Sequence, residues 1–254
     1  MMSSLFSMAG KKALVTGSSG GIGRALAMAF AEAGADTIIL HGSRPDGERL
    51  CAEFAAAGAR AHYVAGDLTG VGAGRAVAEE VMKKTGGVDI VVLNAAVQIR
   101  RPWLEITPEE FDKQIRANLQ ASLEILQILV PAMQEKRWGR ILTIGSVQQR
   151  KPHPQMAVYA AMKAAQMNLA GNLSRQLAGD GITVNNLSPG VILTGRNAGA
   201  LADEQYASAV LSTIPVGFFG EVQDCLGAAI LLCTEAGRYI TGIDLPVDGG
   251  FGLP

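Results

Sequence analysis

Tyr159 and Lys163 stand four residues apart in a stretch, 156–178, that is rich in Ala, Met, Leu and Gln. These residue types favour a helix, and side chains four apart lie one above the other on the same helical face. An ammonium group beside a phenol favours the phenolate, so we expect Lys163 to lower the pKa of Tyr159 from its ordinary value of about 10. The pair therefore predicts general acid–base chemistry at a substrate.

A glycine-rich stretch, 17–23, joins a short apolar run at 13–16 to a helical segment at 24–32. Glycines at such a junction let the backbone approach a pyrophosphate, whose negative charge is favoured at the amino end of a helix. The spacing, Gly-x-x-x-Gly-x-Gly, is one residue longer than the common dinucleotide-binding pattern. This turn predicts that the protein binds a dinucleotide cofactor.

Short apolar runs alternate with helical segments along the whole chain. We expect strands at 13–16, 37–41, 61–65, 89–93, 140–144, 182–187 and 243–247, and helices at 24–32, 47–57, 73–84, 108–136 and 156–178. This alternation predicts parallel β-α-β units with helices on both faces of a sheet. The predicted fold class is α/β, a doubly wound (Rossmann) parallel sheet of about seven strands. With no repeat or linker, we expect a single domain, 1–254, that includes a leader at 1–10.

Ligands of doubly wound sheets bind beyond the carboxyl ends of the strands. Within two residues of the ends of the first six predicted strands come Gly17, Gly42, Asp67, Asn94, Ser146 and Pro189. We therefore expect the residues that carry chemistry to gather along one edge of the sheet.

Several motifs, taken together and in this order, resemble the short-chain dehydrogenase/reductase family. They are the turn 16–23, Asn94-Ala95, Asn118, Ser146, the stretch 159–163 and Pro189-Gly190. The resemblance is to the compact form of that family, which has about the length of this chain, and it extends from residue 10 to residue 250.

The resemblance implies that Asn118, Ser146, Tyr159 and Lys163 form one catalytic group. Tyr159 would be the general acid/base at the substrate oxygen, and Ser146 would hydrogen-bond the same oxygen. Lys163 would hold the nicotinamide ribose, and Asn118 would help to position a water that passes protons to Lys163. Without these partners, Ser146 would be interpreted as an ordinary strand-end hydroxyl and Asn118 as a surface amide.

The resemblance also implies which residues contact the cofactor. They are Gly17, Ser19, Gly21, Ile22, Gly23, Asp67, Leu68, Asn94, Ala95, Tyr159, Lys163, Pro189, Gly190, Ile192 and Thr194. An acid at the end of the second strand would bind the adenosine ribose of NAD. In this chain Gly42 stands at that position, and Ser43 and Arg44 follow it. A hydroxyl and a guanidinium suit a 2′-phosphate, so we expect NADP(H) to be favoured over NAD(H). In the alternative interpretation, Arg44 points into solvent.

The family usually has Asn-Asn-Ala-Gly after the fourth strand, where this chain has Leu-Asn-Ala-Ala at 93–96. We expect this change to alter the pocket slightly without abolishing cofactor binding. The region 190–220 corresponds to the variable substrate loop of the family.

Polar residues near the predicted catalytic group suit a small polar substrate. Gln98 and Gln148 are expected to contact it together with Ser146 and Tyr159. We predict an NAD(P)-dependent oxidoreductase that interconverts a secondary alcohol and a ketone of a sugar, polyol or hydroxy acid. One alternative is a 3-oxoacyl thioester (acyl-carrier-protein) reductase, and another is a dinucleotide-binding module without catalysis.

Composition limits the possible partners. A net charge of −1 without a basic run argues against nucleic acid, and no apolar run is long enough to predict a membrane span. The three cysteines and His41, His62 and His153 lack the spacing of metal ligands, so we expect no metal. We expect a cytoplasmic protein. The helices at 108–136 and 156–178 resemble those that form the family's dimer interface, which implies a homotetramer.

Overall fold

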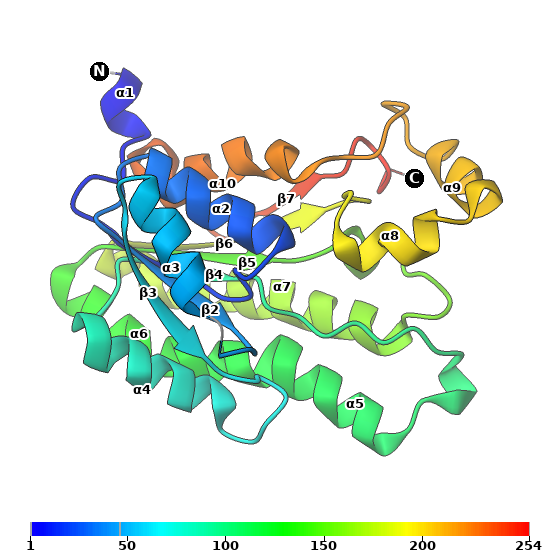
Figure 1. Ribbon diagram of the computed structural model, residues 1–254, viewed down its shortest axis with the longest axis horizontal. Helices are drawn as coiled ribbons and strands as arrows, with labels where there is room; N and C mark the ends of the chain where they lie inside the picture. The colour runs from blue at the N-terminus through cyan, green and yellow to red at the C-terminus, as the bar shows by residue number, and fades with distance from the viewer. Residues whose placement is uncertain (1, 46, 254) are drawn as a thin grey trace.

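A computed structural model describes residues 2–45 and 47–253 (Figure 1). Three residues lie outside the described ranges. They are Met1 of the predicted leader, Asp46 of the turn after the second predicted strand, and Pro254 at the end of the predicted domain. One parallel sheet has the strand order β3-β2-β1-β4-β5-β6-β7. Its strands are β1 (Lys12–Val15), β2 (Thr37–Gly42), β3 (Arg60–Ala65), β4 (Ile90–Leu93), β5 (Gly139–Ile144), β6 (Ile182–Pro189) and β7 (Asp244–Val247).

Helices cover both faces of the sheet, which confirms the doubly wound architecture (Figure 1). One face packs against α2 (Gly21–Glu32), α3 (Gly47–Ala56) and α10 (Leu226–Cys233), and the other against α4 (Ala73–Thr85), α6 (Ala121–Lys136) and α7 (Ala157–Leu177). Successive strand residues point to opposite faces. In β1, for example, Leu14 belongs to the second of these cores and Val15 to the first.

The remaining helices are short. They are α1 (Met2–Leu5), α5 (Pro108–Ile115), α8 (Gly195–Leu201) and α9 (Glu204–Leu211), with 3-10 turns η1 (Trp103–Glu105), η3 (Val147–Gln149), η4 (Ala178–Asp180), η5 (Val222–Cys225) and η6 (Glu235–Gly237). The leader is part of the fold, because Met8 is completely buried in the core. Within residues 2–45 and 47–253, every helix is too short or too polar to cross a membrane.

The strand register brings the carboxyl ends of the strands to one edge. Val15 of β1 lies opposite Leu40 of β2 and Val92 of β4. Further along the sheet, Ile144 of β5 lies opposite Leu187 of β6. The loops that follow β1, β4, β5 and β6 therefore start at the same edge, as the sequence predicts.

The helix predicted at 108–136 begins as expected but is not uniform. Its start is a capping box, in which Thr107 and Glu110 each accept the other's backbone N–H at 3.2 Å. Between α5 and α6 lies a π-helical turn, η2 (Arg116–Gln120), which contains Asn118. Such turns are rare and often occur at functional sites.

Candidate active site

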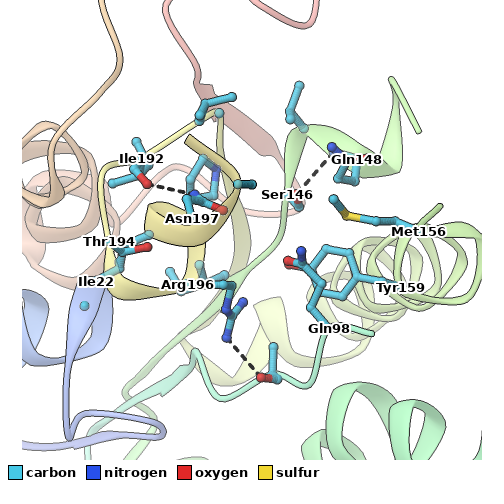
Figure 2. A pocket seen from close by; sticks show the side chains of 18 of the residues that line it. Ile22, Gln98, Ser146, Gln148, Met156, Tyr159, Ile192, Thr194, Arg196 and Asn197 are labelled. Carbon is cyan, nitrogen blue, oxygen red and sulfur yellow. Dashed lines mark hydrogen bonds between the residues drawn. The ribbon is translucent and has the colours of Figure 1, made fainter. Parts of the chain in front are cut away.

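A cavity of about 500 Å³ opens beyond the carboxyl ends of the strands. Figure 2 shows Thr194 on one side of it and Ser146 and Tyr159 on the other. Most of the predicted site residues line this cavity: Gly17, Ser19, Gly21, Ile22, Asn94, Gln98, Ser146, Gln148, Tyr159, Lys163, Pro189, Gly190, Ile192 and Thr194. Segments that are far apart in the sequence are thus brought together as expected.

The glycine-rich turn after β1 needs glycine for two different reasons. Gly17 has a φ of +65°, which side-chain-bearing residues rarely adopt. At Gly23 a Cβ would come within 2.4 Å of the Asn94 side-chain nitrogen and 2.5 Å of the Gly17 carbonyl oxygen. The turn can therefore close only with glycine at these positions.

Asn94 and Thr16 hold this turn in place from inside the protein. The Asn94 side-chain amide donates to the carbonyl oxygens of Thr16, at 2.9 Å, and Gly17, at 3.1 Å. The Thr16 hydroxyl accepts the backbone N–H groups of Asn94 and Ala95 at 2.9 and 3.0 Å. The Asn-Ala pair after β4 thus shapes the turn from behind, and Ala95 itself does not line the cavity.

His41, the last residue of the strand predicted at 37–41, supports the same turn. Its ring Nδ1 accepts the backbone N–H of Gly17 at 3.1 Å, and Nε2 lies 3.1 Å from the carbonyl oxygen of Gly66. Because Nδ1 accepts, the ring proton belongs on Nε2, which donates to Gly66. Burial lowers the pKa of His41 to about 4, so the ring is neutral at pH 7.

The start of α2 fits the pyrophosphate of a dinucleotide. Its N-cap, Gly20, supplies no capping side chain, and the first turn contains no acid. A Cβ at Gly20 would meet no atom within 4 Å, so the space beside the turn is open. The backbone N–H groups of this first turn can therefore bind an anion, helped by the helix dipole.

Tyr159 lies in the first turn of α7 and is 5% exposed. Ser146, after β5, lies near it, and the Ser146 hydroxyl accepts the backbone N–H of Gln148 at 3.2 Å (Figure 2). The sequence-based expectation of a lowered pKa is wrong for this structure. Burial is the largest influence and raises the pKa of Tyr159, while Arg196 and Ser146 act to lower it.

Lys163 lies one helical turn further along α7 and is fully buried. Its Nζ donates to the carbonyl oxygen of Ile144 at 2.6 Å and to the side-chain oxygen of Gln166 at 3.0 Å. The Gln166 amide in turn donates to the Ser122 hydroxyl at 3.1 Å. Burial, followed by repulsion from Arg196, lowers the pKa of Lys163 to about 7.

Asn118 is also fully buried, but it lies behind the cavity rather than in its wall. Its side-chain amide makes two hydrogen bonds of 2.8 Å with the backbone N–H and carbonyl of Val97. Asn118 therefore fixes the segment that follows β4. The water path from Asn118 to Lys163 stays a prediction.

The predicted adenosine end of the site lies outside the cavity. Ser43 and Arg44 are exposed on the turn after β2, and Asp67 is exposed after β3, whereas Leu68 is buried. A Cβ at Gly42 would lie 2.6 Å from the Tyr63 hydroxyl, so Tyr63 occupies the space beside the position of the missing acid.

The lining residues that were not predicted as site residues include Arg100, His153, Arg196 and Phe251. Arg196 Nη2 donates a hydrogen bond of 3.0 Å to the Ala96 carbonyl oxygen (Figure 2). This contact links α8 to the segment after β4. The Phe251 carbonyl accepts from Lys151 Nζ at 3.0 Å. The only signal in the sequence was proximity, since Arg196 follows Thr194 and Arg100 follows Gln98 by two residues.

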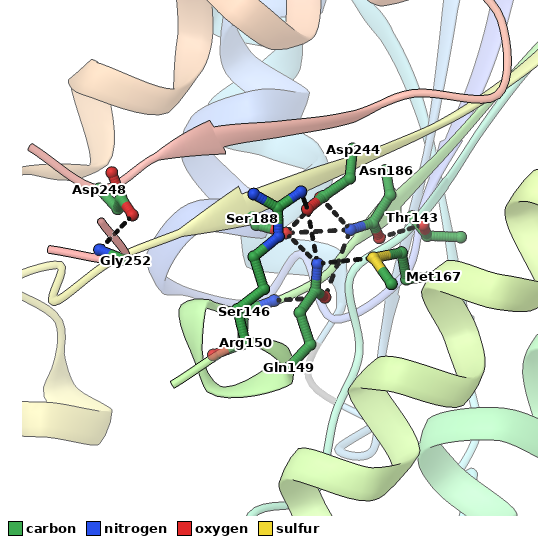
Figure 3. A network of polar contacts seen from close by, with 10 residues as sticks. All are labelled: Thr143, Ser146, Gln149, Arg150, Met167, Asn186, Ser188, Asp244, Asp248 and Gly252. Atoms are coloured by element: carbon green, nitrogen blue, oxygen red, sulfur yellow. Dashed lines mark hydrogen bonds and ion pairs between the residues drawn. The ribbon is translucent and has the colours of Figure 1, made fainter. Parts of the chain in front are cut away.

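A polar network supports the loop that carries Ser146 (Figure 3). The Asp244 carboxylate, which is 7% exposed, pairs with Arg150 at 2.7 Å and accepts hydrogen bonds from Gln149, Asn186 and Ser188. The Gln149 side-chain oxygen accepts the backbone N–H of Ser146 at 3.4 Å. The network therefore connects β6 and β7 to the start of η3.

Comparisons with known proteins agree with this geometry. The family model described as enoyl-(acyl carrier protein) reductase matches residues 17–252. The chain is 36% identical over 241 residues to the 3-oxoacyl-[acyl-carrier-protein] reductase FabG of Escherichia coli (strain K12), covering 95% of this chain and 97% of that protein.

Two solved structures are similar over almost their full length. One is a 3-oxoacyl (acyl-carrier-protein) reductase from Agrobacterium tumefaciens C58 with NADP bound (TM-score 0.93, 37% identity, 98% of this chain and 97% of that one). The other is a gluconate 5-dehydrogenase from Burkholderia cenocepacia J2315 in complex with NADP and tartrate (TM-score 0.93, 32% identity, 99% of this chain and 98% of that one). The chain belongs to the short-chain dehydrogenase/reductase family, and the relatives that it matches are NAD(P)-dependent enzymes acting on CH–OH groups.

Proposed function

We propose that this enzyme is an NADP(H)-dependent oxidoreductase that interconverts a secondary alcohol and a ketone of a small polar substrate. The observation that carries the proposal is the meeting of Ser146, Tyr159 and Lys163 with the glycine-rich turn in one cavity. A sugar, polyol or hydroxy acid suits the polar lining of its substrate end, where Gln98 and Gln148 lie.

Tyr159, Ser146 and Lys163 have separate roles in the proposed reaction. When bound, the dinucleotide supplies or accepts the hydride. In the reducing direction Tyr159 donates its hydroxyl proton to the carbonyl oxygen, and Ser146 donates a hydrogen bond to the same oxygen as charge develops there. Lys163, held by Ile144 and Gln166, presents an ammonium to the ribose hydroxyls and favours the tyrosinate that remains.

The preference for NADP(H) over NAD(H) rests on the end of β2. The residue at this position is Gly42 and not an acid, and Ser43 and Arg44 are exposed beside it. The Arg44 guanidinium forms no ion pair with any described residue. The similar structures from Agrobacterium tumefaciens C58 and Burkholderia cenocepacia J2315 contain NADP, which also favours this choice.

A second candidate is the reduction of a 3-oxoacyl thioester on an acyl carrier protein. Its support is the similarity to FabG of Escherichia coli, at 36% identity. The chemistry at Tyr159 would be the same, and only the group beyond the reacting carbon would differ.

The test is a reaction of the purified protein with NADPH or NADH and a panel of ketoses, oxo acids and a 3-oxoacyl thioester. Oxidation of NADPH with a ketose or oxo acid, abolished by Tyr159→Phe, supports the proposal. Turnover confined to the thioester would favour the second candidate. Cofactor binding without any turnover would indicate a non-catalytic binding module.

We also propose a cytoplasmic homotetramer. Phe111 on α5 and Leu123 on α6 are exposed apolar side chains on 108–136, one of the two segments that the family resemblance assigns to a dimer interface. The three cysteines are free thiols, which suits a reducing compartment. Light scattering on the purified protein and fractionation of cells that express it test the two parts separately.

A further inference from the structure

The charged residues of the cavity are all basic. Arg100, Lys163 and Arg196 line it, together with His153, and none of the described residues that line it is an aspartate or a glutamate. A cleft lined by charge of one sign raises the local concentration of ligands of the opposite sign. Lys163 and the amino end of α2 are accounted for by the cofactor, which leaves Arg100 and Arg196 to be explained.

Arg100 lies at the substrate end of the cavity. Its neighbour Arg101 donates its backbone N–H to the carbonyl oxygen of Gln155 at 2.9 Å, which joins this segment to the one that carries His153. The backbone N–H of His153 donates to the side chain of Gln148, a predicted substrate contact. Arg100 and His153 are therefore on the side of Gln148, away from the cofactor turn.

The charge of Arg100 is not neutralised within the described part of the chain. No carboxylate there pairs with it, whereas the adjacent Arg101 forms an ion pair of 2.7 Å with Glu110 outside the cavity. The His153 ring adds a donor beside Arg100. Its Nδ1 accepts the backbone N–H of Gln155 at 3.1 Å, so the proton of the neutral ring is on Nε2.

The two arginines influence different titratable groups of the cavity. The charge of Arg196 acts to lower the pKa values of both Tyr159 and Lys163. The charge of Arg100 acts instead to lower the pKa of His153. An anionic group bound by Arg100 would lie on the side of His153 and Gln148. Gln98 and Gln148 line the same cavity, and their side-chain amides suit hydroxyl groups.

We propose that the substrate is a polyhydroxylated carboxylic acid, with its carboxylate bound by Arg100 and His153 and its reacting carbon at Ser146 and Tyr159. This proposal rests on the proposed oxidoreductase function and selects the acid among the small polar substrates. Guanidinium binds carboxylate through two parallel N–H groups, so the site would discriminate an acid from its neutral counterpart.

The test compares matched pairs of ketones that differ only in the charged group, such as 5-ketogluconate and sorbose, with NADPH as reductant. We expect kcat/KM for the acid to exceed that for the neutral partner by roughly tenfold to a hundredfold. Arg100→Gln should lower this acid-to-neutral ratio by about tenfold, mainly through KM. The matched control is Arg101→Gln, which should keep the wild-type ratio.

Binding to the protein saturated with NADP⁺ provides a second readout by calorimetry, and Arg100→Gln should weaken binding of the acid. Equal use of acid and neutral ketones, or an unchanged ratio in Arg100→Gln, would overturn the assignment of the carboxylate site while leaving the oxidoreductase intact. Turnover of the thioester alone would refute both the acid and the small-substrate proposal. A protein that neither turns over nor binds any member of the panel would refute the function as well.

Discussion

The ring nitrogen Nδ1 of His41 accepts a hydrogen bond of 3.1 Å from the backbone N–H of Gly17. A strand-end side chain thus holds the first glycine of the turn proposed to bind pyrophosphate. The contact exists only while the ring is neutral, since a protonated ring has no acceptor. Lowering the pH should therefore remove this hydrogen bond and destabilise the glycine-rich turn.

The free energy of unfolding should depend on pH through His41. Its pKa is about 4 in the folded protein, against an ordinary value of 6.5. As the pH falls, the unfolded chain takes up the proton first, so the stability is complete above pH 6.5 and is lost toward pH 4. The full loss is about 3 kcal/mol.

Urea unfolding of the wild type and of His41→Gln across this pH window measures the effect. The variant lacks the titrating ring, so it should lose less stability than the wild type between pH 6.5 and pH 4. The same loss in both proteins would show that His41 is not the group responsible.

Tyr159→Phe should lower kcat by roughly a hundredfold to ten-thousandfold, because it removes the proton donor at the substrate oxygen. Binding of NADPH, measured by fluorescence titration, should persist because the glycine-rich turn is unchanged. Tyr239, which is 99% exposed, offers a matched control in Tyr239→Phe. A Tyr159→Phe protein with wild-type turnover would remove Tyr159 from the mechanism.

Gln166 should act as a positioning residue for Lys163. Its side-chain oxygen accepts from the buried ammonium at 3.0 Å. Gln166→Leu removes this acceptor, so the pKa of Lys163, already lowered to about 7, should fall further. The loss of activity on the alkaline side of the pH profile should then begin at lower pH.

Gln166→Glu provides the opposite change, because a carboxylate beside the ammonium favours its charged form. Its alkaline limb should move to higher pH. Profiles that coincide for the wild type and both variants would indicate that Gln166 only fills space.

Arg44→Ala should raise the KM for NADPH about tenfold while leaving the KM for NADH nearly unchanged, because only NADPH carries the 2′-phosphate. Arg60→Ala, at the opposite end of β3 from this site, is the matched control. Steady-state kinetics with NADPH and with NADH measure the two KM values. Equal effects on the two KM values would refute a phosphate contact at Arg44.

Asp244→Ala should lower the free energy of unfolding by about 3 kcal/mol or more, since Gln149, Asn186, Ser188 and Arg150 would each lose an acceptor in a largely buried network. It should also lower kcat, because Gln149 would no longer hold the backbone of Ser146. Asp180→Ala removes a surface ion pair with Arg137 and should cost about 1 kcal/mol or less. Similar losses in the two variants would argue against a special role for the network.

The sheet and most of the cavity wall could be predicted because their signals are local. Apolar runs between helical segments indicate parallel strands, and the residue after each strand must then lie at the shared edge. Ser146 and Pro189 were found in this way, from their places after the fifth and sixth predicted strands.

Residues whose role depends on a distant partner could not be found. His41 ends an apolar strand, and nothing nearby in the sequence indicates that Gly17 and Gly66 meet its ring. Arg196 faces the cavity because α8 folds back toward Ala96, 100 residues earlier. An arginine in a loop is usually solvated, so its type alone carries little information.

Two predictions were wrong in part because the spacing of residue types does not reveal the type of a helical turn or the burial of a side chain. The helical pattern at 108–136 is compatible with an uninterrupted α-helix, and it does not reveal the π turn that directs Asn118 to Val97. The spacing of Tyr159 and Lys163 gives their shared face but not their burial. Burial reversed the expected direction of the pKa of Tyr159.

Phe251 lines the cavity and its carbonyl accepts from Lys151, so the carboxyl end of the chain runs along the catalytic cleft. In Figure 1, α1 lies at the left of the molecule and the segment that follows β7 lies toward the right, far from α1. An affinity tag or fusion partner attached behind Phe251 would therefore stand next to the substrate, while one attached at the amino end would stand far from it. Choosing the amino end for purification keeps kinetic measurements on this enzyme free of that interference.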